Sequence, residues 1–307
     1  MAKSREIFVC DQCGNESLQW QGLCPACGAG DSLKRVSIAR DRPERRALTA
    51  ASTQPQRLSE VAQTEDARIR TGLEELDRVL GGGLVLGSVT LLGGDPGIGK
   101  STMLLQASDT LSHAVPTLYV TGEESLRQVS LRARRLGTAG DALQLLAETS
   151  IDTIIEHARD ARVSVLVIDS IQTMFARDVE SSPGSAAQVR EAAAALVRFA
   201  KASGVSVLII GHVTKEGVIA GPRILEHMVD TVLYFESDAG SRFRLVRAVK
   251  NRFGAANEIG VFAMTEQGLK EVKNPSAIVL SQHSTPVSGS SVMVAREGSR
   301  PMLIEVQ

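Results

Sequence analysis

Residues 92–101, LGGDPGIGKS, combine glycines, a lysine and a serine at a spacing that suits phosphate binding. The stretch 94–101 fits G-x4-G-K-[ST], whose glycines let backbone N–H groups converge on an anion without a Cβ in the way. Lys100 is expected to neutralise the β- and γ-phosphates of a nucleotide, and Ser101 to offer its hydroxyl to Mg²⁺. A plain strand–turn–helix junction would explain the glycines but not the Lys-Ser pair. The predicted nucleotide-binding residues are Gly94, Asp95, Pro96, Gly97, Ile98, Gly99, Lys100, Ser101 and Thr102.

Polar side chains end three apolar segments further along the chain. VLVIDS places Asp169 after a buried strand, where a carboxylate can hold Mg²⁺ through water. YVTGEES ends a strand with Glu123 and Glu124, and one of them is expected to polarise the attacking water. Two adjacent glutamates cannot point into one pocket in the same way, so the other is expected to pair with a cation. IIGHVTKEG ends a strand with His212, for which we expect γ-phosphate sensing, with a purely structural histidine as the alternative.

All four cysteines lie within the first 28 residues, in two C-x2-C pairs that are each followed by glycine: Cys10, Cys13, Cys24 and Cys27. Two such knuckles supply four thiolates in a tetrahedron, which is typical of a structural zinc site. A pair of disulfides is the alternative, disfavoured in a reducing compartment. Iron in place of zinc stays open on spacing alone. We therefore expect structural Zn²⁺, with Trp20 packed over the small module.

An alternation of strands and helices must position the phosphate-binding loop and the acidic residues. The segments 88–94, 116–125, 163–172 and 205–213 are nearly continuous apolar runs, as in parallel strands that are buried on both faces. The segments 101–112 and 185–204 have apolar residues at helical spacing. The pattern predicts an α/β core whose mainly parallel sheet is flanked by helices.

The whole chain has the composition of a globular protein. Its length of 307 residues suggests about two domains. In the whole chain, 43% of the residues are hydrophobic and 22% are charged, and the formal net charge is −1. A net charge so close to zero does not indicate a nucleic-acid binder, so local patches would have to provide such contacts. No apolar run approaches the ~20 residues of a membrane span, and the first residues lack a secretory signal. We expect a cytoplasmic location and no membrane partner.

Composition divides the chain into four parts. Residues 1–33 form the expected zinc module, and residues 34–64, rich in Arg, Ala, Ser, Thr and Gln, are expected to be a flexible linker. Residues 65–275 form the expected ATPase core. In residues 276–307, SVMVA and MLIEV flank the turn REGSRP, which predicts a linker followed by one hairpin.

Several motifs, taken in order, carry a resemblance to a known family. The cysteine knuckles, GGDPGIGKST, YVTGEES, LVIDSIQT, GHVTKEG and VKNRFG together resemble the RecA-like motor ATPases, and more narrowly the RadA (Sms) family of bacterial recombination proteins. The resemblance implies a RecA-like P-loop ATPase core that works as a hexameric ring. It implies a DNA-stimulated ATPase and helicase that drives branch migration of recombination intermediates during DNA repair. The implied partners are single-stranded and branched DNA and a RecA-type recombinase.

The resemblance also assigns roles to single residues. Glu123 matches the water-activating glutamate of RecA-like proteins better than Glu124. The signature K-N-R-F-G occupies residues 250–254, and its Lys250 and Arg252 resemble the pair that hexameric helicases insert into a neighbouring subunit's nucleotide site. From the residues alone, AVKNRFG reads only as a strand that ends in a basic turn.

Two loops are expected to face DNA, because the corresponding loops of RecA-like motors line the central channel. They are residues 175–188 and residues 214–226, where Lys215 and Arg223 could contact phosphates. Family members continue into a Lon-protease-like domain, of which this sequence is expected to hold only the first hairpin. We therefore expect a monomeric or weakly associated chain without ATP and DNA.

Two alternative functions belong to other classes. The first is a nucleotide-controlled oligomeric switch or scaffold without translocation. The second treats the zinc module as a partner-docking device that the ATPase only positions. Stimulation of ATP turnover by DNA separates the motor from the switch, and deletion of residues 1–33 separates it from the docking device.

Overall fold

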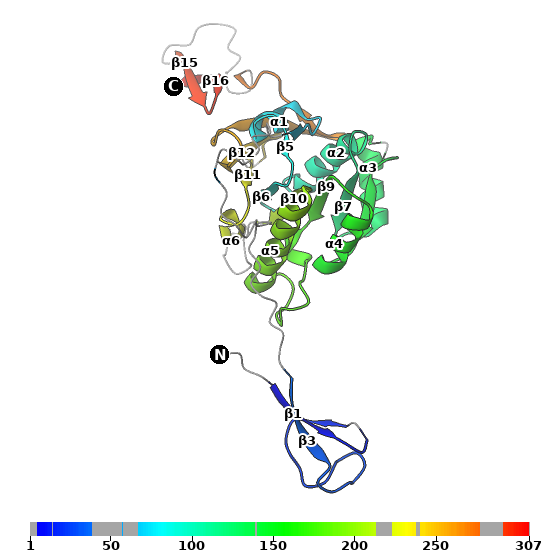
Figure 1. Ribbon diagram of the computed structural model, residues 1–307. Helices are drawn as coiled ribbons and strands as arrows, with labels where there is room; N and C mark the ends of the chain where they lie inside the picture. Colours follow the sequence, from blue (N-terminus) through cyan, green and yellow to red (C-terminus); the bar gives the residue numbers. More distant parts are fainter. Residues whose placement is uncertain are drawn as a thin grey trace. The chain divides into compact units, whose positions relative to one another are not determined.

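The structure is a computed structural model that describes residues 5–13, 15–38, 57, 67–138, 140–212, 223–237, 240–276 and 291–306. The chain divides into two compact units, Met1–Ala47 and Leu48–Gln307. Figure 1 shows the elements of both units with their labels.

The first unit is a small antiparallel sheet in the order β2-β1-β3. Its strands are β1 (Arg5–Cys10), β2 (Glu16–Ser17) and β3 (Leu33–Ile38). The expected start of the linker at residue 34 is too early, because β3 pairs with β1 up to the Arg5–Ile38 pair. The charged residues at 34 and 35 suggested a linker, but backbone pairing with β1 holds them in a strand. Apart from Arg57, the expected linker beyond residue 38 lies outside the described residues.

The second unit, within the described residues, is built on a nine-stranded sheet in the order β14-β13-β12-β11-β6-β10-β9-β7-β8. The strands from β11 to β8 are parallel: β11 (Thr231–Glu236), β6 (Val89–Gly94), β10 (Ser206–His212), β9 (Val165–Asp169), β7 (Thr117–Thr121) and β8 (Gln144–Ala147). Antiparallel strands complete the sheet: β12 (Phe243–Asn251), β13 (Ile259–Thr265) and β14 (Gly268–Glu271). The predicted mainly parallel α/β core is confirmed.

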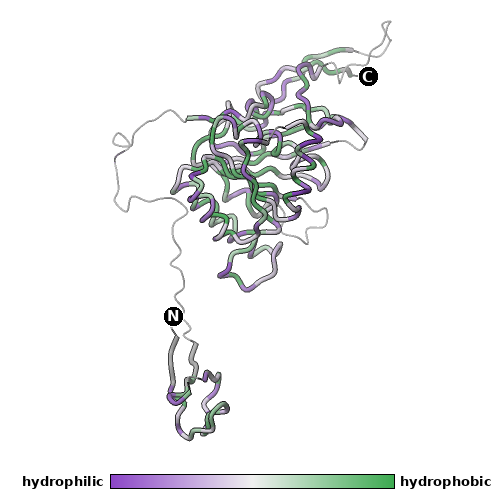
Figure 2. Tube along the Cα trace, turned by 90° about the vertical axis from the view of Figure 1, so that its right-hand side faces the viewer, coloured by the Kyte–Doolittle hydropathy of each residue, from purple (hydrophilic) through white to green (hydrophobic). Residues whose placement is uncertain are grey.

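Helices cover both faces of this sheet (Figure 1). They are α1 (Glu74–Leu80), α2 (Lys100–Ser112), α3 (Leu126–Leu136), α4 (Ile151–Asp160), α5 (Ala186–Ser203) and the short α6 (Arg223–Glu226), with a 3₁₀ turn at Ile171–Thr173. Alternate side chains of β7 enter different cores: Leu118 and Val120 join the core beneath α4 and α5, and Tyr119 joins the core beneath α1 and α2. Hydrophobic segments accordingly run through the interior of the unit (Figure 2).

This sheet brings distant parts of the sequence together at one edge. Parallel strands all end at the same edge, so the residues that follow β6, β7, β9 and β10 meet there. The opposite edge holds the starts of these strands and, since β12 is antiparallel, the end of β12. The two edges are called the carboxyl edge and the amino edge below.

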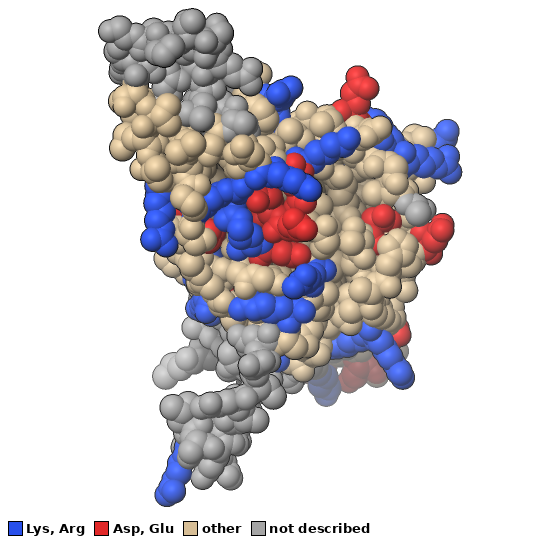
Figure 3. Space-filling view, turned by 90° about the horizontal axis from the view of Figure 1, so that it is seen from above, with Lys and Arg blue, Asp and Glu red and all other residues tan. Residues whose placement is uncertain are grey.

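The last described segment is a hairpin of β15 (Ser291–Glu297) and β16 (Arg300–Val306). Arg300 Nη1 lies 2.6 Å from Glu75 Oε2, and that carboxylate also pairs with Arg78 of α1 at 3.1 Å. Arg78 in turn contacts Glu258 at 2.9 Å. Basic and acidic side chains gather on the face above α1 (Figure 3). Charged contacts thus attach the hairpin turn to the ATPase unit, and its place in a Lon-protease-like domain stays a prediction.

Two shorter strands, β4 (Arg68–Ile69) and β5 (Leu84–Val85), pair antiparallel on either side of α1 in the sequence. Arg68 donates from Nη2 to the carbonyl of Phe253 at 2.6 Å and from Nη1 to the carbonyl of Leu80 at 3.3 Å. The segment around α1 is therefore tied to the turn that follows β12.

Candidate active site

The glycine-rich loop connects the carboxyl end of β6 to the first turn of α2. Gly99 precedes the helix with a φ of 119°, and a Cβ there would lie 2.6 Å from Cε of Met264. Gly94 has a φ of 152°, and a Cβ there would lie 2.8 Å from the carbonyl oxygen of Phe235. Both positions need glycine, because other residues rarely adopt these angles and the space is filled. Arg244 supports the loop from outside through a 3.1 Å hydrogen bond from Nε to the carbonyl of Ile98.

The start of α2 suits an anion. Among the described residues, no side chain caps this helix and no acidic residue lies in its first turn. The first N–H groups of a helix lack partners within the helix, and they carry the positive end of its dipole. A phosphate bound by the loop would therefore meet both donors and positive charge.

Lys100 is folded back over the loop. Its Nζ donates to the carbonyl of Gly94 at 2.8 Å and to that of Asp95 at 2.7 Å, and only 3% of the residue is exposed. Burial lowers the pKa of Lys100 to about 8, although the carboxylates of Asp169, Asp95 and Glu123 act in the opposite direction. A phosphate in the loop would provide the full negative charge that this buried ammonium lacks.

Asp169 ends β9 at the same edge and is 7% exposed. The hydroxyl of Tyr119 donates to its Oδ2 at 2.5 Å. Burial raises the pKa of Tyr119 well above its usual value, and the charge of Asp169 adds to this, so the phenol stays protonated as a donor. Tyr119 therefore orients the carboxylate of Asp169.

Glu123 and Glu124 follow β7 but have different partners. Oε1 of Glu123 accepts a 2.5 Å hydrogen bond from the hydroxyl of Ser170 and lies 3.4 Å from Nε2 of His212. Oε1 of Glu124 instead pairs with Arg132 of α3. The side chain of Glu123 is 46% exposed and faces residues of the carboxyl edge, whereas the charge of Glu124 is taken up by a neighbouring helix.

His212 ends β10 at this edge and is partly buried. Burial lowers the pKa of His212, and the charge of Lys100 lowers it further, so the ring is neutral at neutral pH. Its Nδ1 is a buried atom without a hydrogen-bond partner in the described part of the chain. The side chain of Gln172 donates to the backbone carbonyl of His212 at 3.3 Å. These contacts join the end of β10 to Glu123 and to the turn after β9.

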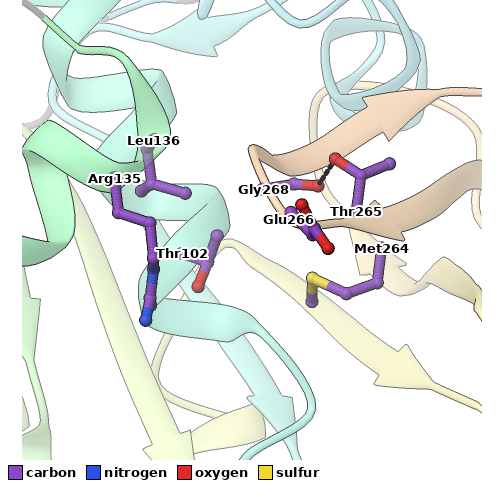
Figure 4. A pocket seen from close by; sticks show the side chains of 7 residues that line it. All are labelled: Thr102, Arg135, Leu136, Met264, Thr265, Glu266 and Gly268. Carbon is purple, nitrogen blue, oxygen red and sulfur yellow. Dashed lines mark hydrogen bonds between the residues drawn. The ribbon is translucent and has the colours of Figure 1, made fainter.

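An open pocket of about 500 Å³ lies beside the loop. It is lined by Thr102, Arg135, Leu136, Met264, Thr265, Glu266 and Gly268. Thr102 and Arg135 face the turn between β13 and β14 across this space, and a 2.8 Å hydrogen bond from Thr265 to the Gly268 carbonyl closes that turn (Figure 4). The pocket adjoins the predicted phosphate site, since Thr102 follows Ser101 directly.

Lys250 and Arg252 lie at the amino edge, away from the loop. Asn251 pairs with Thr231, which pairs with Thr90 near the start of β6, whereas Gly94 ends β6. Thr90 and Gly94 are four residues apart along β6, which corresponds to about 13 Å along the strand. The side chain of Arg252 is 54% exposed, and its Nη1 lies 3.0 Å from Asp230 Oδ1.

Lys250 differs from Arg252 in its contacts. Its Nζ donates to the carbonyls of Glu226 and Val229 at 2.7 and 2.8 Å. Burial lowers the pKa of Lys250, and the charge of Arg252 lowers it further. The ammonium is therefore held by backbone of its own chain, while the guanidinium of Arg252 remains largely at the surface.

The first expected DNA loop, residues 175–188, is described throughout. Gln188, 2% exposed, accepts from the amide of Ala176 at 2.8 Å and donates to the carbonyls of Val179 and Ser181 at 2.9 Å. In the second loop, Lys215 lies outside the described residues. Arg223 begins α6, and its side chain is likewise outside them.

The four cysteines form one cluster in the first unit. Their Sγ atoms all lie within 4.8 Å of one another, with 3.7 Å between Cys10 and Cys27 and 3.6 Å between Cys13 and Cys24. Bonds of 2.3 Å to a tetrahedral zinc ion place sulfur atoms about 3.8 Å apart, so the thiols fit Zn²⁺. All four are free thiols, which rules out the disulfide alternative in this structure.

The expectation for Trp20 was wrong. The residue is 56% exposed and does not cover the module, and Leu18 and Leu23 are exposed as well. Among the described side chains, the small core of the module consists of Cys10, Cys24 and Leu33 with Phe8 packed against it.

Sequence reasoning missed the residues that hold the candidate site residues in place. Tyr119 holds Asp169, Ser170 holds Glu123, Arg132 holds Glu124 and Arg244 holds the loop. Only Ser170, which directly follows Asp169, carried a signal by its position. The other contacts join elements that are distant in the sequence.

A parallel sheet whose glycine-rich loop leads into α2, with acidic residues at the ends of nearby strands, defines a P-loop ATPase domain. Residues 54–218 match the family described as an AAA domain, in agreement with this fold. Residues 8–35 match the family described as a rubredoxin metal binding domain, in agreement with the cysteine cluster. The chain thus combines an ATPase domain with a four-cysteine zinc-binding site.

Relatives extend along the whole chain. A DNA repair protein RadA of Pseudomonas aeruginosa is 56% identical over 309 residues, which cover 100% of this chain and 68% of the relative. Proteins of the same name from Escherichia coli and Bacillus subtilis are 53% and 49% identical, with the same coverage. The chain belongs to the RadA family. Among the described residues, no helix has the length and apolar character needed to cross a membrane.

Proposed function

We propose that this chain is a DNA-dependent ATPase motor that acts on recombination intermediates in homologous recombination and DNA repair, as a branch-migration helicase. Support comes from the ATPase domain and from relatives that are named DNA repair proteins. Its proposed partners are single-stranded and branched DNA, a RecA-type recombinase and further copies of the chain in a hexameric ring.

In the proposed reaction, the loop binds the β- and γ-phosphates of ATP through backbone N–H groups and Lys100. Ser101 and Asp169 would hold Mg²⁺, which neutralises charge on the phosphates. The open pocket next to Thr102 would take the nucleoside. The contacts that now hold Lys100, the carbonyls of Gly94 and Asp95, would be exchanged for phosphate oxygens.

Glu123 is the proposed general base for the attacking water. It lies at the edge with Ser170 and His212 and has no lysine or arginine partner among the described contacts, whereas Glu124 is neutralised by Arg132. His212, which contacts the same oxygen, would report the presence of the γ-phosphate to the segment after β10.

The placement of Lys100 and Arg252 at opposite edges of one sheet is the observation that carries the proposal. Arg252 cannot serve the loop of its own chain, but it is exposed enough to enter the site of a second copy. There its charge would stabilise the transferred phosphoryl group, as an arginine finger does. Lys250 would join it after leaving the carbonyls of Glu226 and Val229.

The test is ATP turnover with and without single-stranded DNA, at low salt and over a range of protein concentrations. A motor with shared sites predicts turnover per chain that rises with DNA and with concentration. Lys100→Ala should abolish turnover and weaken nucleotide binding. Arg252→Ala should spare binding and slow hydrolysis by about 10³-fold or more, the contribution typical of an arginine finger. The matched control is Arg198→Ala, which removes an arginine that pairs with Glu191 on α5.

Each outcome decides between functions. Turnover that ignores DNA, in this chain and in full-length relatives, would favour the oligomeric switch over the motor. Normal hydrolysis by Arg252→Ala in the presence of DNA would overturn the shared site. Movement along DNA is tested separately, by displacement of a labelled strand from a branched substrate.

A further inference from the structure

We propose that Asp230 and Lys201 are positioning residues for Arg252, holding its guanidinium in place for the neighbouring site. The inference rests on the proposed function, because the two residues would support Arg252 in its proposed role at the nucleotide site of a second copy. Neither residue stands in a recognisable motif, and neither touches the nucleotide loop.

Asp230 is a buried carboxylate that contacts the turn after β12, the start of β6 and helix α5. It is 2% exposed and lies directly before β11. Its Oδ1 lies 3.0 Å from Nη1 of Arg252, and its backbone carbonyl accepts from the Arg252 amide at 3.2 Å. One residue therefore holds both the backbone and the side chain of Arg252.

Lys201 supplies the second charge. Its Nζ lies 2.7 Å from Oδ2 of Asp230, which also accepts from the amide of Val89 at 3.0 Å. The same ammonium lies 5.9 Å from the ring centroid of Phe253, the residue after Arg252. The side chain of Lys201 is 24% exposed and that of Arg252 is 54% exposed, so Lys201 is the more buried of the two cations that compensate the buried charge of Asp230. Lys201 belongs to the last turn of α5, so a long helix anchors the group of charges formed by Lys201, Asp230 and Arg252.

This arrangement preorganises Arg252. A free arginine side chain has many rotamers, and fixing it at the moment of reaction costs conformational entropy. Here one nitrogen of the guanidinium is fixed by Asp230, while 54% of the side chain remains exposed. A cation that is held in place before the transition state stabilises charge without reorganisation.

A purely structural ion pair at the sheet edge is the competing explanation, and it makes different predictions. Loss of a structural pair would lower stability, and its effect on turnover would add to that of Arg252→Ala. Loss of a positioning residue would act only through Arg252, so the double variant would be no slower than Arg252→Ala alone.

The experiment compares Lys201→Met, Asp230→Asn, Arg252→Ala and the double variant Lys201→Met/Arg252→Ala. The matched control is Arg198→Met, which removes a cation from the preceding turn of the same helix. For each protein we would measure nucleotide affinity with a fluorescent ATP analogue, thermal unfolding, assembly with ATP and DNA by light scattering, and DNA-stimulated turnover. Lys201→Arg keeps the charge and tests rescue.

The expected result is a loss of turnover of roughly 10- to 100-fold in Lys201→Met and Asp230→Asn, the range that is typical when the residues supporting metal ligands are replaced. Affinity and assembly should be unchanged, Lys201→Arg should recover most of the activity, and the double variant should match Arg252→Ala. Mixing Lys201→Met with Lys100→Ala should restore turnover, because the second protein supplies intact Arg252 to intact loops. An unfolded variant could not be restored in this way.

Three outcomes would overturn the inference. Full turnover in both single variants, with Arg252→Ala slow, would show that Arg252 needs no support. Additive loss in the double variant would indicate a structural role. Normal turnover in Arg252→Ala would remove the shared site itself, and the positioning role would fall with it.

Discussion

Oε1 of Glu123, which follows β7, lies 3.4 Å from Nε2 of His212, which ends β10, although β9 separates these two strands in the sheet. The same oxygen accepts a hydrogen bond from the hydroxyl of Ser170, which follows β9. The ends of β7, β9 and β10 are therefore linked through one carboxylate. Any movement of Glu123 toward a water molecule changes its contacts with both neighbours, and His212 directly precedes the segment that leads to the second expected DNA loop.

The two adjacent glutamates should differ sharply in their effect on hydrolysis. Glu123→Gln should reduce single-turnover ATP hydrolysis by about 10²- to 10⁴-fold, because it removes the proposed base. Glu124→Gln should leave the rate within a few fold, because that carboxylate is paired with Arg132. Nucleotide affinity, measured by equilibrium titration, should be retained in both. An equal loss of rate in the two variants would contradict the assignment.

Nucleotide binding should take up a proton at alkaline pH. The pKa of Lys100 is lowered to about 8 by burial, so much of this lysine is neutral above that pH. Phosphate charge should raise the pKa again, and about 0.9 proton per nucleotide should be taken up at pH 9 by linkage. Nucleotide affinity should fall as the pH rises through 8.

Calorimetry in buffers of different ionisation enthalpy measures this uptake directly. Lys100→Arg is the control, because arginine remains charged over this range and should take up no proton. Identical binding enthalpies in all buffers at pH 9 for the unaltered chain would contradict the prediction.

Removal of the metal should unfold the first unit and leave the ATPase unit intact. Among the described side chains of the first unit, the apolar core consists of Cys10, Cys24 and Leu33, with Phe8 packed against it. Zinc contributes about 10–16 kcal/mol to folding in comparable small modules, so this core should not persist alone. Hydrogen exchange after chelation should show lost protection in residues 5–38, with protection kept in β6 and β10. Retained protection of β1 and β3 would contradict a structural metal.

Gln188→Leu should loosen the loop 175–188. The substitution removes the partners of the Ala176 amide and of the carbonyls of Val179 and Ser181. A buried polar group without its partner costs about 1–3 kcal/mol, so the free energy of unfolding should fall by roughly that amount. Denaturant titration and hydrogen exchange of residues 176–182 measure the effect. Arg190→Leu, at an exposed position of the same helix, is the control and should change neither measurement.

Much of the fold was predictable because its signals are local. Apolar runs such as 163–172 and 205–213 predicted buried parallel strands, and β9 and β10 lie within them. The end of the zinc module was placed too early, because the charged residues 34 and 35 resemble a linker until β3 pairs with β1. Trp20 was expected to pack over that module, but it is 56% exposed, because so small a module offers little apolar surface to cover.

The sequence by itself determined which residues make up the candidate sites: the glycines and Lys100 of the loop, Asp169 at a strand end, and four cysteines in two knuckles. These motifs depend on spacings of a few residues, so local backbone conformation brings their members close together. The tertiary structure decided which of Glu123 and Glu124 faces the site, and it placed Arg252 at the opposite edge on Asp230 and Lys201. Those outcomes depend on contacts between strands and helices that are far apart in the chain. Burial strengthens each of these contacts, because a buried charged group without a partner is costly.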